Sequence, residues 1–69
     1  MTVHLIYNEV KGERLFLCWS DSKKEAAWIS DQRRKEMNGL FGRVAYFERE
    51  LAEKRAKQLS NGKVLTINI

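Results

Sequence analysis

The stretch that decides the fold is "TVHLIYNEVKGERLFLCW", residues 2 to 19. Two runs rich in β-branched and aromatic residues flank Lys11 and Gly12, and this pattern predicts a β-hairpin. Glycine at the second turn position suits a tight turn whose backbone has positive φ angles. The hairpin is therefore the first element that we expect in the fold.

The register of this hairpin follows from the residues that would stand opposite one another. If Val10 pairs with Glu13, the oppositely charged Glu9 and Arg14 face each other, and such pairs stabilise a ladder. A register one residue shorter would instead place two negative charges, Glu9 and Glu13, opposite each other. The expected pairs are Val10–Glu13, Glu9–Arg14, Tyr7–Phe16 and Leu5–Cys18, with Asn8–Leu15, Ile6–Leu17 and His4–Trp19 on the other side.

In this register both faces of the hairpin are apolar. An antiparallel sheet with one wet face alternates apolar and polar side chains. We therefore expect a helix on one face. A second helix, another copy of the chain or a partner protein would cover the other face.

Residues 22 to 37 are predicted to form the first helix. Ser22 and Glu25 have the spacing of a capping box, and Asn38-Gly39 is a stop signal. At 100° per residue the helix turns Trp28 away from its buried face, toward water or a partner. The residues expected on the buried face are Ala26, Ile29, Arg33 and Met37.

The remaining residues predict a strand, a helix and a strand. Residues 43–48 favour a strand because Val44, Tyr46 and Phe47 favour β-structure. The alternative is one long helix over residues 40–60, since Leu40, Val44, Phe47 and Leu51 also fall at helical spacing. Residues 48–60 predict a helix, and the final run "KVLTINI" predicts a strand.

Together these elements predict one α+β domain over residues 1–69. The expected architecture is a small, mainly antiparallel sheet of three or four strands with two helices, in the order ββαβαβ. The alternative order is ββααβ. A chain this short buries only about 60% of its unfolded surface, so its stability is marginal unless a partner adds to it.

Composition argues against several classes of function. The chain has one cysteine and one histidine, so neither an internal disulfide nor a zinc site is expected. There is no glycine-rich phosphate loop, and we expect no enzyme activity, no cofactor and no metal. The apolar runs are shorter than the roughly 18 residues that span a membrane, and we expect no signal peptide because the first residues lack a charged start followed by an apolar run. A cytoplasmic protein is the expectation, in the host cytoplasm if the protein is viral.

Two surfaces are candidates for binding. The first is a partner-binding surface around Trp28, since exposed tryptophan is enriched at hot spots. Its expected residues are Trp28, Lys24, Gln32, Leu40 and Phe41, although Leu40 and Phe41 could instead form a hydrophobic seal below Met37. The second is a basic, nucleic-acid-binding surface, suggested by a net charge of +4. Its expected residues are Arg33, Arg34, Lys35 and Arg43, although cations also simply favour the last turn of a helix.

The layout "VHLIYNEVKGERLFLCWSDSKKEAAWI…RVAYFERELAEK" resembles small accessory proteins of bacteriophages and prophages that open with a ββαβ unit. The resemblance covers residues 3 to about 54 and carries over no functional residue. It implies a small non-enzymatic protein that binds, and often inhibits, a host protein. Protein binding is therefore the predicted function. Nucleic-acid binding and an obligate homodimer with a structural role are the alternatives.

Overall fold

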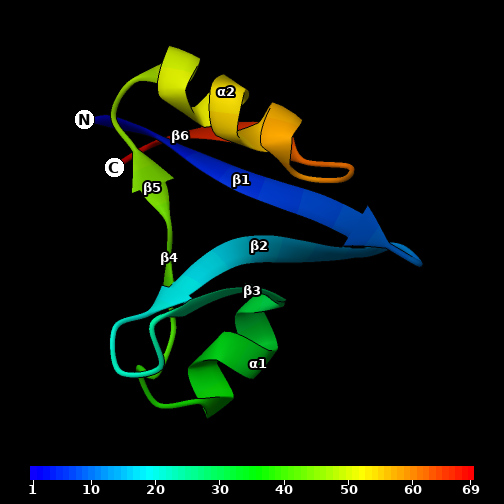
Figure 1. The fold of residues 1–69 in the computed structure, drawn as a ribbon, viewed down its shortest axis with the longest axis vertical. Helices are drawn as coiled ribbons and strands as arrows, with labels where there is room; N and C mark the ends of the chain where they lie inside the picture. Colours follow the sequence, from blue (N-terminus) through cyan, green and yellow to red (C-terminus); the bar gives the residue numbers. More distant parts are fainter.

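The computed structural model describes residues 1–69 and shows a small α+β fold with one antiparallel sheet and two helices (Figure 1). The predicted fold class is confirmed, but the sheet has six strands rather than three or four. The elements are β1 (Thr2–Val10), β2 (Glu13–Ser20), β3 (Glu25–Ile29), α1 (Asp31–Glu36), β4 (Gly42–Arg43), β5 (Ala45–Tyr46), α2 (Arg49–Gln58) and β6 (Lys63–Asn68).

The predicted hairpin is present, and its register near the turn is confirmed. The four pairs closest to the turn are Val10–Glu13, Glu9–Arg14, Asn8–Leu15 and Tyr7–Phe16. Lys11 and Gly12 both have positive φ angles, of 52° and 80°. Two consecutive residues with positive φ match the right-handed twist of the strands that they join.

Beyond the Tyr7–Phe16 pair, β1 and β2 separate and the segment of β4 and β5 lies between them (Figure 1). The predicted pairs Ile6–Leu17, Leu5–Cys18 and His4–Trp19 are therefore wrong. The inserted segment hydrogen-bonds to both strands, which then need no bonds to each other. The pairs formed instead are Leu5–Ala45 and His4–Tyr46 with β5, and Cys18–Arg43 and Trp19–Gly42 with β4. The predicted strand over residues 43–48 is thus two short strands, 42–43 and 45–46.

The predicted helix over residues 22–37 is wrong, because residues 25–29 form β3 and only residues 31–36 are helical. Ser22 caps no helix. Instead, the Oγ atom of Ser20 accepts a hydrogen bond from the backbone N–H of Lys23 at 3.2 Å. Lys24 has a φ of 54° and reverses the chain into β3. The N-cap of α1 is Ser30, whose Oγ accepts from the backbone N–H of Arg33 at 3.3 Å.

Strand geometry explains why residues 25–29 do not join the helix. β3 pairs with β2 over five residues, and successive side chains of a strand point to opposite faces of the sheet. Ala27 and Ile29 consequently pack on one face, while Trp28 packs on the other. A helix could not bury all three of these side chains on the hairpin.

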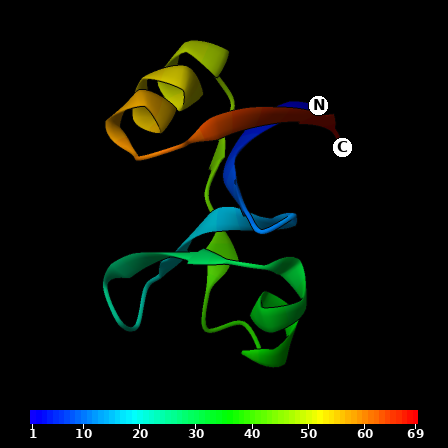
Figure 2. The same cartoon turned by 90° about the vertical axis from the view of Figure 1, so that its right-hand side faces the viewer.

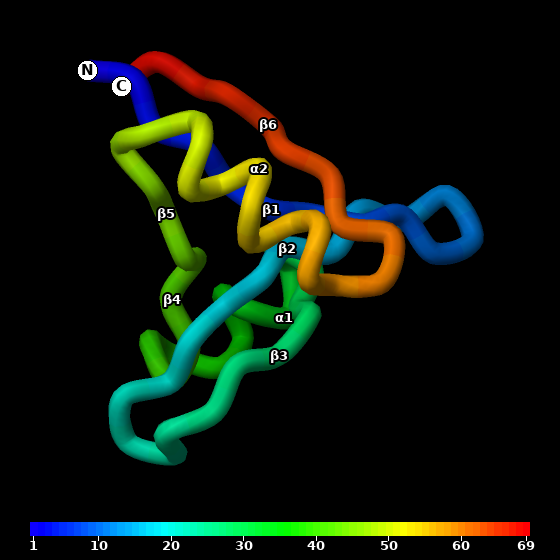
Figure 3. Tube along the Cα trace, turned by 45° about the horizontal axis from the view of Figure 1, so that its top comes forward, coloured from blue at the N-terminus to red at the C-terminus, as the bar shows by residue number.

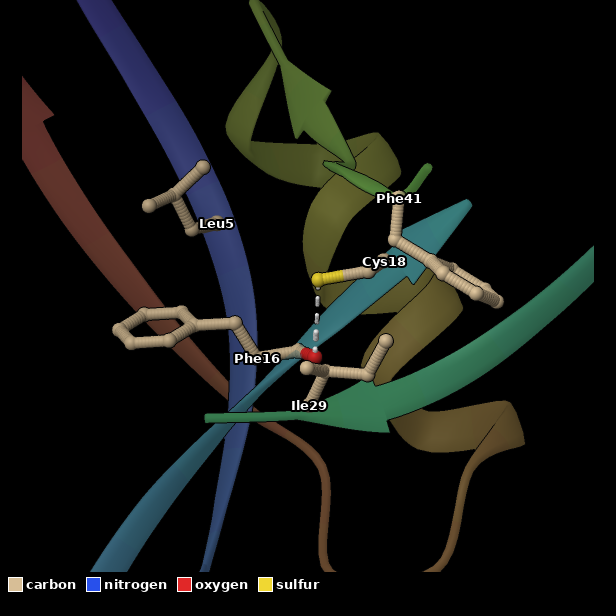
Figure 4. Close-up of a cluster of buried hydrophobic side chains, with 5 residues drawn as sticks. All are labelled: Leu5, Phe16, Cys18, Ile29 and Phe41. Carbon is tan, nitrogen blue, oxygen red and sulfur yellow. Dashed lines mark hydrogen bonds between the residues drawn. The ribbon is translucent and has the colours of Figure 1, made fainter. Parts of the chain in front are cut away.

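Both apolar faces of the hairpin are covered by the chain itself. On one face, Phe41 belongs to the buried cluster shown in Figure 4, and Met37 packs against that cluster. On the other face, Ala56 of α2 is part of a second cluster, and Leu59 packs against it. The buried residues of the first cluster are Leu5, Phe16, Cys18, Ile29 and Phe41, and those of the second are Ile6, Leu17 and Ala56.

α2 lies within the predicted range of residues 48–60 and runs back into β6 through a tight turn. Asn61 in this turn has a φ of 59°. A Cβ atom at Gly62 would stand 2.6 Å from the backbone oxygen of Ala56, so only glycine allows the turn to lie this close to the helix. Figure 2 shows α2 and α1 at opposite ends of the molecule, separated by the strands.

Replacing Trp28 with alanine is expected to lower the free energy of unfolding by about 2–3 kcal/mol. A fully buried aromatic side chain contributes about 3–5 kcal/mol, and Trp28 is half-buried against the second cluster. Urea denaturation followed by circular dichroism measures the change. The matched control is Trp19→Ala, which should cost about 1 kcal/mol or less because Trp19 is 43% exposed. Equal costs for the two variants would contradict the placement of Trp28.

Candidate functional site

A cleft of about 500 Å³ lies at the end of β2, opposite the turn that connects β1 to β2. Its lining includes Trp19 and residues 21 and 22, which begin the β2–β3 turn. The lining also includes residues 39 and 40, which follow α1, and residues 42–44 of the inserted segment. The cleft therefore exists because the inserted segment holds the residue 38–41 loop against the end of β2.

Two large apolar side chains of this cleft reach solvent. Trp19 is 43% exposed and Leu40 is 37% exposed. Trp19 stands opposite Gly42 in the ladder between β2 and β4, and glycine offers no side chain to cover the indole ring. The indole Nε1–H donates a hydrogen bond to Oδ1 of Asp21 at 3.0 Å, which holds the ring beside the cleft.

An ionic cluster fixes the position of Arg43, which also lines the cleft. Oδ1 of Asp31 lies 3.6 Å from Nε of Arg43 and 3.7 Å from Nε of Arg34. The guanidinium of Arg43 also lies over the ring of Phe16, 5.3 Å from its centroid. One carboxylate thus stands between two cations, and it offsets part of their charge.

Cys18 lies directly beneath this cluster and is fully buried. Its Sγ donates a weak hydrogen bond to the backbone oxygen of Phe16 at 3.4 Å (Figure 4). Burial raises the pKa of the Cys18 thiol, and Asp31 adds to this effect, while Arg34 and Arg43 oppose it. The thiol is therefore neutral at physiological pH and packs as a small apolar side chain.

The residues predicted for partner binding do not form one surface. Trp28 is half-buried in β3 and packs against the second cluster, and Phe41 is 4% exposed in the first cluster. Lys24 is exposed in the β2–β3 turn, and Gln32 is exposed on α1. Of the five predicted residues, only Leu40 lines the cleft. The predicted helix would have aligned Lys24, Trp28 and Gln32, but residues 24 and 28 lie in a turn and a strand.

The four residues predicted for nucleic-acid binding do not share one environment. Arg33 and Lys35 are exposed on α1. Arg34 and Arg43 both turn toward Asp31, and each keeps only a part of its side chain in solvent. Two of the four predicted cations are therefore engaged in an ion-pair cluster.

The only histidine also lies away from the cleft. His4 is buried, and its Nδ1 is 2.8 Å from Oγ1 of Thr66.

No three side chains among the histidines, cysteines, aspartates and glutamates are grouped so that they could hold a metal ion. Neither helix has the length and the apolar character that crossing a membrane requires.

Sequence reasoning missed Trp19 and Asp21 as site residues. In the predicted register Trp19 pairs with His4, on the same face of the hairpin as Ile6 and Leu17. The available signal was its position at the end of a strand, directly before the polar turn "SDSKK". The aromatic side chain at such a strand end is covered only if another element reaches it, and in the structure α2 packs on β1, β5 and β6 instead.

Comparison of the chain with models of protein families, with curated proteins and with solved structures finds no match. The candidate site therefore rests on geometry alone.

Stability should decline at alkaline pH through Cys18. The thiol pKa is raised above its usual value of 9.0 in the folded chain. The stabilising contribution is therefore complete below the pKa of the unfolded thiol, and it is lost as pH rises because the unfolded thiol ionises first. Above about pH 9, the free energy of unfolding should fall more steeply than in Cys18→Ala, by up to about 1.4 kcal/mol per pH unit. Parallel pH profiles of the two proteins would contradict the burial of the thiol.

Proposed function

We propose that the protein is a small, non-enzymatic protein-binding module that takes an apolar side chain of its partner into the cleft beside Trp19. The observation that carries the proposal is the pair of exposed apolar side chains, Trp19 and Leu40, that line the same open cleft. Tryptophan is enriched at binding hot spots because it offers a large apolar surface and one hydrogen-bond donor.

Polar groups at the rim support the same function. Asp21 and Arg43 flank the cleft with opposite charges, and both are already oriented by hydrogen bonding or ion pairing. Side chains that are held in place before binding lose less conformational entropy when a partner docks. The layout resemblance to phage accessory proteins adds the more specific proposal that the partner is a host protein whose activity is regulated or inhibited.

The ion pairs at Asp31 favour protein binding over nucleic-acid binding. A nucleic-acid surface gains affinity by releasing counterions from phosphates, and each cation that is already paired contributes less to this release. Arg34 and Arg43 share Asp31, so only Arg33 and Lys35 of the predicted basic residues remain unpaired.

The decisive experiment is affinity capture from a bacterial lysate with three variants of the cleft and its surroundings. Trp19→Ala should weaken binding of the captured protein by about 2 kcal/mol or more, as hot-spot tryptophans do. Gly42→Leu should block the cleft without removing any of its side chains, since the space around Gly42 is open. The matched control is Phe47→Ala, because Phe47 is 71% exposed and does not line the cleft.

Capture that survives Trp19→Ala and Gly42→Leu but not Phe47→Ala would contradict the cleft as the binding site. Capture that disappears after nuclease treatment would favour the nucleic-acid alternative. In that case affinity should fall with salt, with a slope of about −0.9 per phosphate neutralised on duplex DNA. Circular dichroism of each variant distinguishes a loss of binding from a loss of folding.

A further inference from the structure

A second surface lies at the opposite side of the sheet, where β6 forms an open edge. β6 pairs with β1 along its whole length and with no other strand. Figure 3 shows β6, in red, running along the outside of the molecule with β1 on its inner side. An open edge presents unpaired backbone N–H and C=O groups that can pair with another strand.

The hydrogen bonds at the chain ends show which backbone groups are free. The Met1 nitrogen donates to the backbone oxygen of Ile69 at 2.9 Å, and the Ile69 N–H donates to the backbone oxygen of Met1 at 2.7 Å. These residues are a hydrogen-bonded pair, and such pairs alternate along an antiparallel ladder with residues whose groups point away. It follows that the N–H and C=O groups of Val64, Thr66 and Asn68 point outward from the edge.

The two sides of this edge differ in character. Leu65, Ile67 and Ile69 share one side, and Ile69 is 72% exposed. On the other side, a groove of about 310 Å³ runs between β6 and α2. Charged side chains of α2 line this groove on its helix side, and they are Arg49, Glu53 and Lys57.

The groove has a net positive charge. Nε of Arg49 pairs with Oε1 of Glu53 at 2.8 Å, while Lys57 takes part in no ion pair. A second copy of the chain would bring an identical positive groove against this one, and each copy has a net charge of +4. Like charges oppose that pairing, whereas a strand with carboxylates facing α2 is attracted.

We propose that the outer edge of β6 binds an extended segment of a partner protein as an additional antiparallel strand, like every other pair in this sheet, and that this segment alternates apolar and acidic side chains. The apolar side chains pack beside Leu65 and Ile67, and the acidic side chains face Lys57 and Arg49. Backbone hydrogen bonds to Val64, Thr66 and Asn68 supply affinity, and the alternation supplies specificity. This surface is separate from the Trp19 cleft, and the proposal does not depend on the function proposed for that cleft.

The probe is a peptide of about seven residues that alternates valine and glutamate, blocked at both ends, since strands of this length are common. Titration into ¹⁵N-labelled protein should shift the amide signals of Val64, Thr66 and Asn68. The same peptide with lysine in place of glutamate should bind at least about fivefold more weakly, because its charges are repelled.

Two N-methylated peptides test the strand geometry without any change to the protein. In the proposed complex the glutamates pair with Val64, Thr66 and Asn68, so N-methylation of the glutamates removes the hydrogen bonds to the edge and should abolish binding. N-methylation of the valines alters only the outer edge of the peptide and should leave binding intact. Equal binding of the two N-methylated peptides would overturn the proposal.

Variants of the protein test the charge and separate the two surfaces. Lys57→Glu should weaken binding of the valine–glutamate peptide by about fivefold and should strengthen binding of the lysine peptide. Trp19→Ala should leave both titrations unchanged, whatever its effect at the cleft. Shifts at residues 19 and 40 instead of the β6 edge would overturn the proposal. So would concentration-dependent shifts of the β6 amides without peptide, because a second copy would then occupy the edge.

Discussion

The apolar side chains on both faces of the hairpin are the constraint on which the rest of the fold depends. Ile6 and Leu17 face one way, while Leu5, Phe16 and Cys18 face the other. Burial contributes roughly 25 cal/mol per Å² of apolar surface, so neither face can remain in water in a chain this short. The chain has one cysteine and forms no disulfide, and packing alone must supply the cover.

The two covers come from different parts of the sequence and reach the sheet in different ways. α2 packs on β1, β5 and β6, and its small residues Ala52 and Ala56 allow a close approach. On the other face, Met37 and Phe41 lie at the end of α1 and in the loop after it, while α1 itself buries no residue. The position of Phe41 follows from the segment of β4 and β5, which is held between the separated ends of β1 and β2. Because β1 and β2 separate, the inserted segment lies between them, and this places Phe41 on the second face of the hairpin.

Local signals in the sequence predicted some elements and failed for others. The hairpin register near the turn depends on neighbouring residues, so Glu9–Arg14 and Tyr7–Phe16 were predictable. The range of α2 was predictable for the same reason. β3 was not, because "SKKEAAWI" has both helical capping spacing and strand alternation. The free edge of β2, which no local pattern reveals, decides between them. The cleft was missed because Trp19 and Leu40 line one cleft only once the inserted segment is in place, although Leu40 itself was identified as a candidate.

The way in which the two faces are covered also explains which parts of the sheet stay exposed for binding. The cleft lies at the end of β2 that α2 does not reach, and the open edge of β6 lies beyond the last strand that the chain provides. Both surfaces lie where no other element of the chain covers the strands. Trp28, in contrast, is half-buried against the second cluster and belongs to the structure of the fold rather than to either surface.

The most direct test of this account is nuclear Overhauser spectroscopy of the dilute, isolated protein. The account predicts contacts from the Phe41 ring to the first cluster, including Ile29, and contacts from the Ala56 methyl group to Ile6 and Leu17 in the second cluster. Both sets should persist on dilution, because a single chain covers both faces. If Phe41 and Ala56 contacted the same face, or if one set appeared only when chains associate, the central claim would be contradicted.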